Sequence, residues 1–490
     1  MYLGIDVGTS SVKAVLVGDD QHIVAEASAP LTVQRPQPLW SEQSPALWWS
    51  ATCKAMDQLR SSSRDAFVAV RGIGLSGQMH GATLLDANLN VLRPAILWND
   101  GRSHAECAEL EAREPASRSI TGNAAMPGFT APKLLWVERH EPAIFAKTAH
   151  VLLPKDWLRL ELSGDLATDV SDASGTLWLD VANRRWSPAM LAACRLPVNS
   201  MPRVFEGPRP TGTMRPDLAK EWGFSTAPII AAGAGDNAAG AVGAGVVNPG
   251  QALLSLGTSG VVFLVTEQFA PNPAGGVHAF CHAIPDTWHQ MSVMLSAASC
   301  LSWVVSATGA RNEAALLDEI EASGSRPSPV LFLPYLSGER TPHNDPKAQG
   351  VFFGLTHETT RADLGRAVLE GVAFAFADGV QALREAGGAP REITVIGGGS
   401  RSLLWTRVLA SVLGETLLIR RGADLGPAFG AARLARIAVT GEPVGSVCPA
   451  PPVVSRVDPD ESLRDPYLRR LDVYRDLYRR LRPVFAGAPG

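Results

Sequence analysis

Short hydrophobic runs separated by glycine and hydroxyl residues open the chain. Residues 2–8 form one such run, which ends in Gly8-Thr9-Ser10, and residues 12–17 form the next, before a turn-forming stretch over 18–21. Runs of this length between turn residues are typical of β-strands joined by tight turns. With the run over 22–27, the pattern predicts a meander of three strands.

The same pattern returns in the middle of the chain. Residues 252–256 are hydrophobic and lead into Gly257-Thr258-Ser259, after which residues 261–265 continue as a strand-like run. A strand, turn and strand that recur about 250 residues later indicate two halves with related architecture.

Helical and strand-like patterns alternate in the second half, which is typical of an α/β domain. The predicted elements are helices over 362–386, 403–413 and 427–439, and strands over 393–396 and 416–419. Residues 465–481 add an amphipathic helix. Because acids and arginines alternate on its polar side, we interpret it as a packing helix in preference to a membrane or RNA surface.

Length and composition agree with two folded domains. The chain has 490 residues, whereas a single hydrophobic core stops growing near about 250 to 300 residues. Hydrophobic residues make up 46% and charged residues 19%, the balance of a globular protein. We place the domains at 1–246 and 247–490, joined near the turn-forming Asn248-Pro249-Gly250.

Charge and cysteine usage argue against several classes of function. A net charge of −4, with no Lys and Arg cluster before the C-terminal helix, makes a nucleic-acid partner unfavourable. Six cysteines without C-x-x-C spacing argue against a zinc knuckle and a disulfide framework. No signal peptide or long apolar segment is visible, so we expect a cytoplasmic protein without a membrane partner.

The common nucleotide-binding and hydrolase motifs are absent, apart from one glycine motif whose neighbouring residues do not fit a nucleotide site. Gly72, Gly74 and Gly77 match G-x-G-x-x-G, but that fingerprint needs a helix to begin there. The chain instead runs from a strand-like stretch over 67–70 through the glycines into another over 82–85, so we reject a Rossmann site. No Gly-Lys dipeptide, H-E-x-x-H or G-x-S-x-G occurs, which removes the P-loop and two common hydrolase signatures.

The two Gly-Thr-Ser turns are the candidate phosphate sites. A tight turn can aim backbone N–H groups and hydroxyls at a phosphate, and Asp6 beside the first turn adds a carboxylate suited to magnesium. One such turn alone is usually an ordinary hairpin, and Asp6 alone could be a turn residue. Two such turns, each opening an α/β half, would face each other across a cleft.

This arrangement resembles the actin, Hsp70 and hexokinase superfamily, and residues 128–137 and 350–370 resemble the signature stretches of the FGGY carbohydrate kinase family. The resemblance spans nearly the whole chain. It implies two ribonuclease H-like α/β domains with an interdomain active-site cleft that takes ATP, Mg²⁺ and a sugar. Five further segments resemble those of the family's xylulose-phosphorylating members: 77–81, 97–102, 153–156, 235–238 and 336–343.

The resemblance also implies a role for each candidate residue. Asp236 would be the catalytic base, although its own segment favours a helix cap, and Asp6 would assist catalysis; both would lie at the metal. The expected sugar contacts are Gln78, Met79, His80, Trp98, Asn99, Asp100 and Asn237, several of which would be core or structural residues if taken alone. The expected nucleotide contacts are Gly8, Thr9, Ser10, Gly257, Thr258, Ser259, Gly398, Gly399 and Ser400.

The expected reaction is transfer of the ATP γ-phosphate to O5 of D-xylulose, a step of xylose catabolism. Two alternatives stay open: a kinase of the same family for ribulose, fuculose, gluconate or glycerol, and a non-enzymatic sugar or nucleotide sensor on the same fold. The resemblance suggests a homodimer. Because the two turns lie on different domains, we expect the domains to close when both ligands bind.

Overall fold

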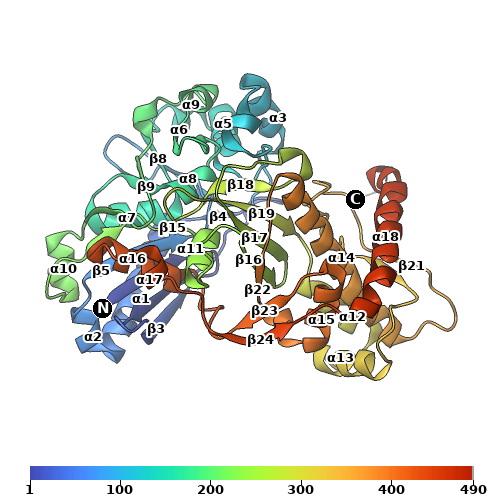
Figure 1. The fold of residues 1–490 in the computed structure, drawn as a ribbon. Helices are drawn as coiled ribbons and strands as arrows, with labels where there is room; N and C mark the ends of the chain where they lie inside the picture. The colour runs from blue at the N-terminus through green and yellow to red at the C-terminus, as the bar shows by residue number, and fades with distance from the viewer. Residues whose placement is uncertain (488–490) are drawn as a thin grey trace.

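The computed structural model describes residues 1–487 and is built around two seven-stranded sheets (Figure 1). The first sheet runs in the order β13-β14-β5-β1-β2-β3, with β15 paired to β5, and the second in the order β18-β19-β17-β16-β22-β23-β24. The first contains β1 Tyr2–Val7, β2 Ser11–Val17, β3 Ile23–Pro30, β5 Gly72–Gly77, β13 Pro210–Thr213, β14 Ile229–Ala231 and β15 Ala234–Gly235. The second contains β16 Gln251–Leu256, β17 Gly260–Thr266, β18 His278–Cys281, β19 Trp288–Met294, β22 Glu392–Ile396, β23 Leu417–Arg420 and β24 Val453–Val457.

The two sheets repeat one topology. In the first, β1 and β2 pair antiparallel, β2 pairs antiparallel with β3, and β1 and β5 pair parallel. In the second, β16, β17, β19 and β22 take the same places with the same directions. The repeat predicted from the two Gly-Thr-Ser turns is therefore confirmed at the level of the whole sheet.

Most predicted elements are confirmed, and one is wrong. The predicted helices appear as α14 Arg361–Glu385, α15 Leu403–Leu413, α16 Pro427–Thr440 and α18 Glu461–Gly487. The strand predicted over 67–70 is instead the end of helix α2 Arg64–Val68, and the glycine-rich segment after it is strand β5. A side chain at Gly74 would overlap the backbone of Ala431 in α16. These glycines therefore let a helix lie directly on the strand, a purpose that the sequence pattern does not reveal.

Helix α16 belongs to the second half of the chain but packs on the first sheet, where it contacts β1, β2, β5 and β14. Figure 1 shows this red helix beside the blue N-terminal strands. It crosses α11 Asp236–Gly243, and the two helix backbones touch, because a side chain at Gly430 would overlap the carbonyl oxygen of Ala239. This crossing connects the halves of the molecule through the helix that begins at Asp236.

The crossing supports a stability prediction. Gly430→Ala forces the two helices apart, so we expect the free energy of unfolding to fall by about 1 to 3 kcal/mol. We expect turnover to fall as well, because α11 begins with Asp236, the expected catalytic base. Gly240→Ala, on α11 itself, is the matched control: its nearest neighbour would be Pro427 Cγ at 4.0 Å, and alanine favours a helix by up to about 1 kcal/mol. Urea denaturation and an activity assay compare the pair. Equal stability of the two variants would disprove the close crossing.

Other helices cover the remaining faces. Helix α1 Pro45–Ser62 contacts β2 and β3, and α14 contacts β17 and β19. A further hydrophobic core joins the two halves, since Phe129 and Leu134 of the first half pack with Phe263 and Phe280 of the second sheet.

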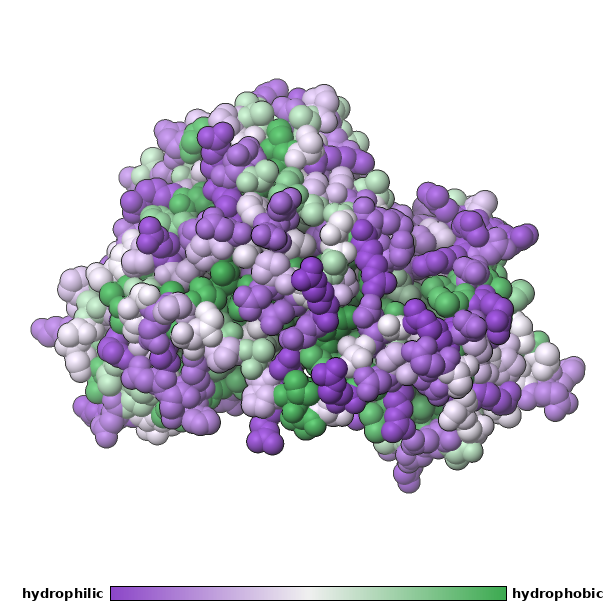
Figure 2. Space-filling view, viewed as in Figure 1, coloured by the Kyte–Doolittle hydropathy of each residue, from purple (hydrophilic) through white to green (hydrophobic). Residues whose placement is uncertain are grey.

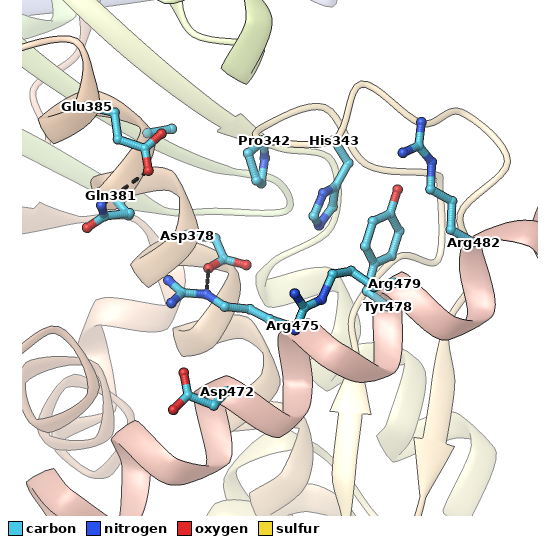
Figure 3. Close-up of a pocket in the computed structure, with 11 residues that line it drawn as sticks. Pro342, His343, Asp378, Gln381, Glu385, Asp472, Arg475, Tyr478, Arg479 and Arg482 are labelled. Atoms are coloured by element: carbon cyan, nitrogen blue, oxygen red, sulfur yellow. Dashed lines mark hydrogen bonds and ion pairs between the residues drawn. The ribbon is translucent and has the colours of Figure 1, made fainter.

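Helix α18 packs on the second half, as predicted, and buries Tyr467, Leu471, Tyr474 and Tyr478. A pocket of about 710 Å³ lies between α14 and α18. Figure 3 shows Arg475 paired with Asp378 on its floor, at 2.6 Å between Nε and Oδ1. None of the site residues predicted from the sequence lines this pocket.

No helix among residues 1–487 is both long and apolar enough to cross a membrane. On the face drawn in Figure 2, hydrophilic residues are spread widely and hydrophobic residues gather in small groups.

Candidate active site

The carboxyl ends of three adjacent strands bring Asp6 and Asp236 together. Strand β5 lies between β1 and β15, and in register Gly77 faces both Val7 and Gly235. Asp6 immediately precedes Val7, and Asp236 immediately follows Gly235 as the first residue of α11. The first Gly-Thr-Ser turn begins one residue after β1, so both carboxylates lie beside it.

Burial disfavours the charged form of both carboxyls, and repulsion from Asp236 adds to this effect at Asp6. Burial and the negative charge of Asp236 raise the pKa of Asp6 to about 7. Burial raises the pKa of Asp236 to about 6, although hydrogen bonds from Asn237 oppose the shift. Two crowded carboxyls with raised pKa values are typical of a functional site.

The same pair fits a divalent cation. Oδ1 of Asp6 is buried without a hydrogen-bond partner within residues 1–487, and a cation would satisfy it. The described residues contain no cluster of three or more His, Cys, Asp or Glu that could hold a metal alone. Magnesium suits such a site, because it commonly binds through one or two carboxylates and completes its shell with water and substrate phosphates.

The second Gly-Thr-Ser turn lies against the triple-glycine segment. A side chain at Gly397 would come within 2.7 Å of the carbonyl oxygen of Leu256 and 3.0 Å of the amide nitrogen of Gly257. Gly397 also has φ 94°, a conformation that favours glycine. Residues 398–401 then form a short 3₁₀ turn before α15. The predicted nucleotide residues of the second half are thus neighbours.

Hydrogen bonds tie the predicted sugar loops to the first turn. The Thr9 hydroxyl accepts from Trp98 Nε1 at 2.9 Å and donates to Gln78 Oε1 at 3.0 Å. Gln78 Nε2 donates to Gln43 Oε1 at 2.9 Å. Met79 and His80 follow Gln78 directly, so the sugar segment and the phosphate turn form one connected unit.

Family models match both halves of the chain. Residues 1–243 match the N-terminal domain of the FGGY family of carbohydrate kinases, and residues 252–439 match its C-terminal domain. The chain belongs to this family.

Close relatives of this FGGY kinase are described as xylulose kinases. It is 54% identical to the xylulose kinase of Escherichia coli K12 over 487 residues, which cover 99% of this chain and 100% of the relative. A crystal structure described as a xyloylose kinase from Brucella ovis has a TM-score of 0.96 and 50% identity, with 99% of each chain covered. The two-domain fold predicted from the sequence is therefore confirmed.

A more distant structure shares the fold alone. The gluconate kinase of Lactobacillus acidophilus has a TM-score of 0.91 at 22% identity, covering 98% of this kinase and 97% of that chain. The fold is therefore common to kinases named for different substrates, and the choice of sugar depends on side chains.

The predicted sugar residues of this kinase differ in their exposure to solvent and in their hydrogen bonding. Trp98, Asn99 and Asn237 are exposed. Gln78 is 1% exposed and bonded as described above, and Asp100 is 2% exposed. The Asp100 carboxylate accepts bonds from Ser41 N, Arg102 N and the Arg102 guanidinium, so its oxygens are occupied.

Several groups that surround His80 are not evident from the sequence. Lys133 Nζ donates to the His80 carbonyl at 2.8 Å, and the Gly175 carbonyl binds the His80 ring at 2.7 Å. His278 and Arg340 approach from the second half, with 3.4 Å between His278 Nε2 and an Arg340 guanidinium nitrogen. Lys133 and Arg340 lie inside segments that resemble the family's, but no spacing rule links either segment to His80.

Proposed function

We propose that this chain phosphorylates D-xylulose on O5 with ATP and releases D-xylulose 5-phosphate and ADP. The observation that carries the proposal is the position of Asp236, at the start of α11 and beside both Asp6 and the first phosphate turn. The 54% identity over the full length of a xylulose kinase supports the choice of sugar. Gluconate, glycerol, ribulose and fuculose are the alternative substrates.

Asp236 acts as the general base. Its Oδ1 accepts hydrogen bonds from Asn237 N at 2.7 Å and Asn237 Nδ2 at 2.9 Å, which orient the carboxylate and leave Oδ2 for the sugar hydroxyl. As the O5–P bond forms and the γ-phosphate leaves ADP, the hydroxyl proton passes to Asp236. Its pKa of about 6 makes it a better proton acceptor than an ordinary carboxylate, while it is still mostly ionised at neutral pH.

The two turns hold the phosphate chain from opposite halves. Gly8, Thr9 and Ser10 contribute from the first sheet, and Gly257, Thr258 and Ser259 contribute from the second. Gly398, Gly399 and Ser400 lie beside the nucleoside. Asp6 and Asp236 would hold Mg²⁺, which would neutralise charge on the transferred phosphate. On this proposal residues 1–246 supply the sugar site and base, and residues 247–490 supply most of the nucleotide site.

Met79, His80, Trp98 and Asn237 contact the sugar directly. Asn99 is the remaining sugar contact in this proposal, and it lines a surface pocket with residues 35–41. Gln78 and Asp100 instead hold the loops in place, because their polar groups are already bonded inside the protein. This refines the roles expected from the sequence.

A panel assay tests the substrate. ADP release is measured by a coupled assay with D-xylulose, D-ribulose, L-fuculose, gluconate and glycerol, each over a range of concentrations. We expect kcat/KM for D-xylulose to exceed that of every other compound by at least about tenfold, since one or two well-placed hydrogen bonds discriminate by that much or more. A higher value for another compound would reassign the substrate. Binding of sugar and ATP without ADP release would favour the sensor alternative.

A further inference from the structure

Gly175 lies directly beneath the two sugar-binding side chains Met79 and His80. It follows α8 Val170–Ser174 and has φ −74° and ψ 0°, a conformation open to any residue. A side chain there would nevertheless come within 2.5 Å of His80 Nδ1 and Cε1 and within 3.0 Å of Met79 Cε. Glycine is therefore required at 175 because a side chain would overlap His80. The backbone conformation of this position does not require glycine.

The Gly175 carbonyl also fixes which nitrogen of His80 carries hydrogen. It lies 2.7 Å from Nδ1, and a carbonyl oxygen can only accept, so Nδ1 must donate. Burial, together with the positive charges of Lys133 and Arg340, lowers the pKa of His80 to about 3. The ring is therefore neutral, and Nε2 presents a lone pair.

Nε2 of His80 is accessible to solvent. Within residues 1–487 no group bonds to it, yet it is not among the buried polar atoms that lack a partner. Unpartnered polar atoms are rare in a protein interior, whereas an accessible ring nitrogen can bind a ligand. A sugar hydroxyl that meets Nε2 must then donate its hydrogen.

The rest of His80 is held in place. Its backbone has φ 70°, a left-handed conformation that costs a non-glycine residue about 1 kcal/mol or more. The His80 carbonyl accepts from Lys133 Nζ at 2.8 Å and from Thr130 Oγ1 at 3.2 Å. The edge-to-face contact with Phe129, at 4.9 Å between ring centroids, fixes the ring plane. Strained backbone held by several contacts is typical of functional sites.

We propose that Gly175 is a positioning residue that fixes His80 as a hydrogen-bond acceptor toward the sugar, so that His80 recognises a donating hydroxyl of the substrate. This inference rests on the proposed function, because it deepens the role of the same sugar site. Gly175 acts only through Met79 and His80. A change at Gly175 should therefore have a smaller effect when the His80 side chain is absent.

A double-mutant cycle provides the test. Gly175→Ala should lower kcat/KM for D-xylulose by about 100-fold, the cost of displacing a contact by about 1 Å, while KM for ATP changes less than about twofold. In a His80→Ala background the same change should cost much less, because the ring it displaces is gone. Gly445→Ala is the control, since nothing lies within 4 Å of a side chain there. Equal losses with and without His80, or an unchanged kcat/KM for Gly175→Ala, would overturn the proposal.

Substrate analogues test the direction of the hydrogen bond. Replacing each hydroxyl of D-xylulose in turn by hydrogen or by fluorine should reveal one position where both changes weaken binding equally, since neither group can donate. That position should lose its effect in His80→Ala. A position where fluorine restores binding through His80 would show that His80 donates, and would overturn the acceptor assignment. If the panel assay shows another preferred sugar, the double-mutant cycle is run with that sugar. The proposal that D-xylulose is the substrate can then fail while the proposal that Gly175 positions His80 is still tested.

Discussion

Asp236→Asn is expected to lower turnover at least about 100-fold while sugar still binds. The amide keeps the size of the carboxylate and the start of α11, but it cannot accept the hydroxyl proton. General-base catalysis contributes about 10² to 10⁴-fold, so kcat should fall by at least about 100-fold. A coupled ADP-release assay measures turnover, and isothermal titration with D-xylulose measures binding, which should change by less than about threefold.

Asp217→Asn is the matched control. Asp217 is also an aspartate in the first turn of a helix, α10 Pro216–Trp222, but it is exposed and lies outside the site. Its replacement should leave kcat unchanged. If Asp236→Asn retains more than about a tenth of wild-type turnover, the proton has another acceptor. If it loses sugar binding as well, Asp236 is chiefly a binding residue.

Lys155→Met is expected to destabilise the protein strongly. Lys155 Nζ lies 2.6 Å from Asp156 Oδ1, 2.9 Å from Asp169 Oδ1 and 3.3 Å from Asp172 Oδ2, and all four side chains are fully buried. Removing the ammonium leaves three buried carboxyls without their cation. Breaking a buried ion pair in this way costs about 3 to 5 kcal/mol, which urea denaturation measures directly.

This charge network also supports the segment that contains Asp236, the proposed base. Asp169 caps α8 and accepts from the Ser171 hydroxyl, and that hydroxyl accepts from Gly235 N at 3.2 Å. Gly235 immediately precedes Asp236 in the sequence. We therefore expect the activity of any folded Lys155→Met protein to fall as well.

Two further variants separate the network from a general effect of losing a lysine. Lys13→Met removes an exposed pair with Glu26, at 3.1 Å, and should cost less than about 1 kcal/mol. Adding Asp172→Asn to Lys155→Met should recover part of the lost stability, because burial holds the pKa of Asp172 well above its usual range and the added change removes one unpaired carboxyl. A loss below about 1 kcal/mol in Lys155→Met would contradict the account of the network.

Local patterns predicted about half of the strands in each sheet. The strand, turn and strand of each half, helix α15 and the strand-to-helix junction at Gly397 to Ser400 all follow from periodicity and turn residues. The β5 strand was missed because Gly72 and Gly74 are usually turn residues. Here they serve contact with α16, a helix more than 350 residues away in the sequence. No local rule reveals such a contact.

The candidate site was predictable only in part. The two phosphate turns and Asp236 came from repetition and resemblance. The surroundings of His80 did not, since Lys133, Gly175, His278 and Arg340 come from four separate segments. The sequence also does not distinguish Trp98 from Gln78 and Asp100. In the structure Trp98 is exposed to solvent, whereas Gln78 and Asp100 are buried and their polar groups are hydrogen-bonded.

The position of the phosphate on the product tests the central claim most directly. The chain is incubated with ATP, Mg²⁺ and D-xylulose labelled with ¹³C at C5, and the product is followed by ¹³C and ³¹P NMR. The account predicts a phosphorus coupling at C5 together with one equivalent of ADP. Phosphate on another carbon, or no phosphorylated sugar while ATP is hydrolysed, would contradict it.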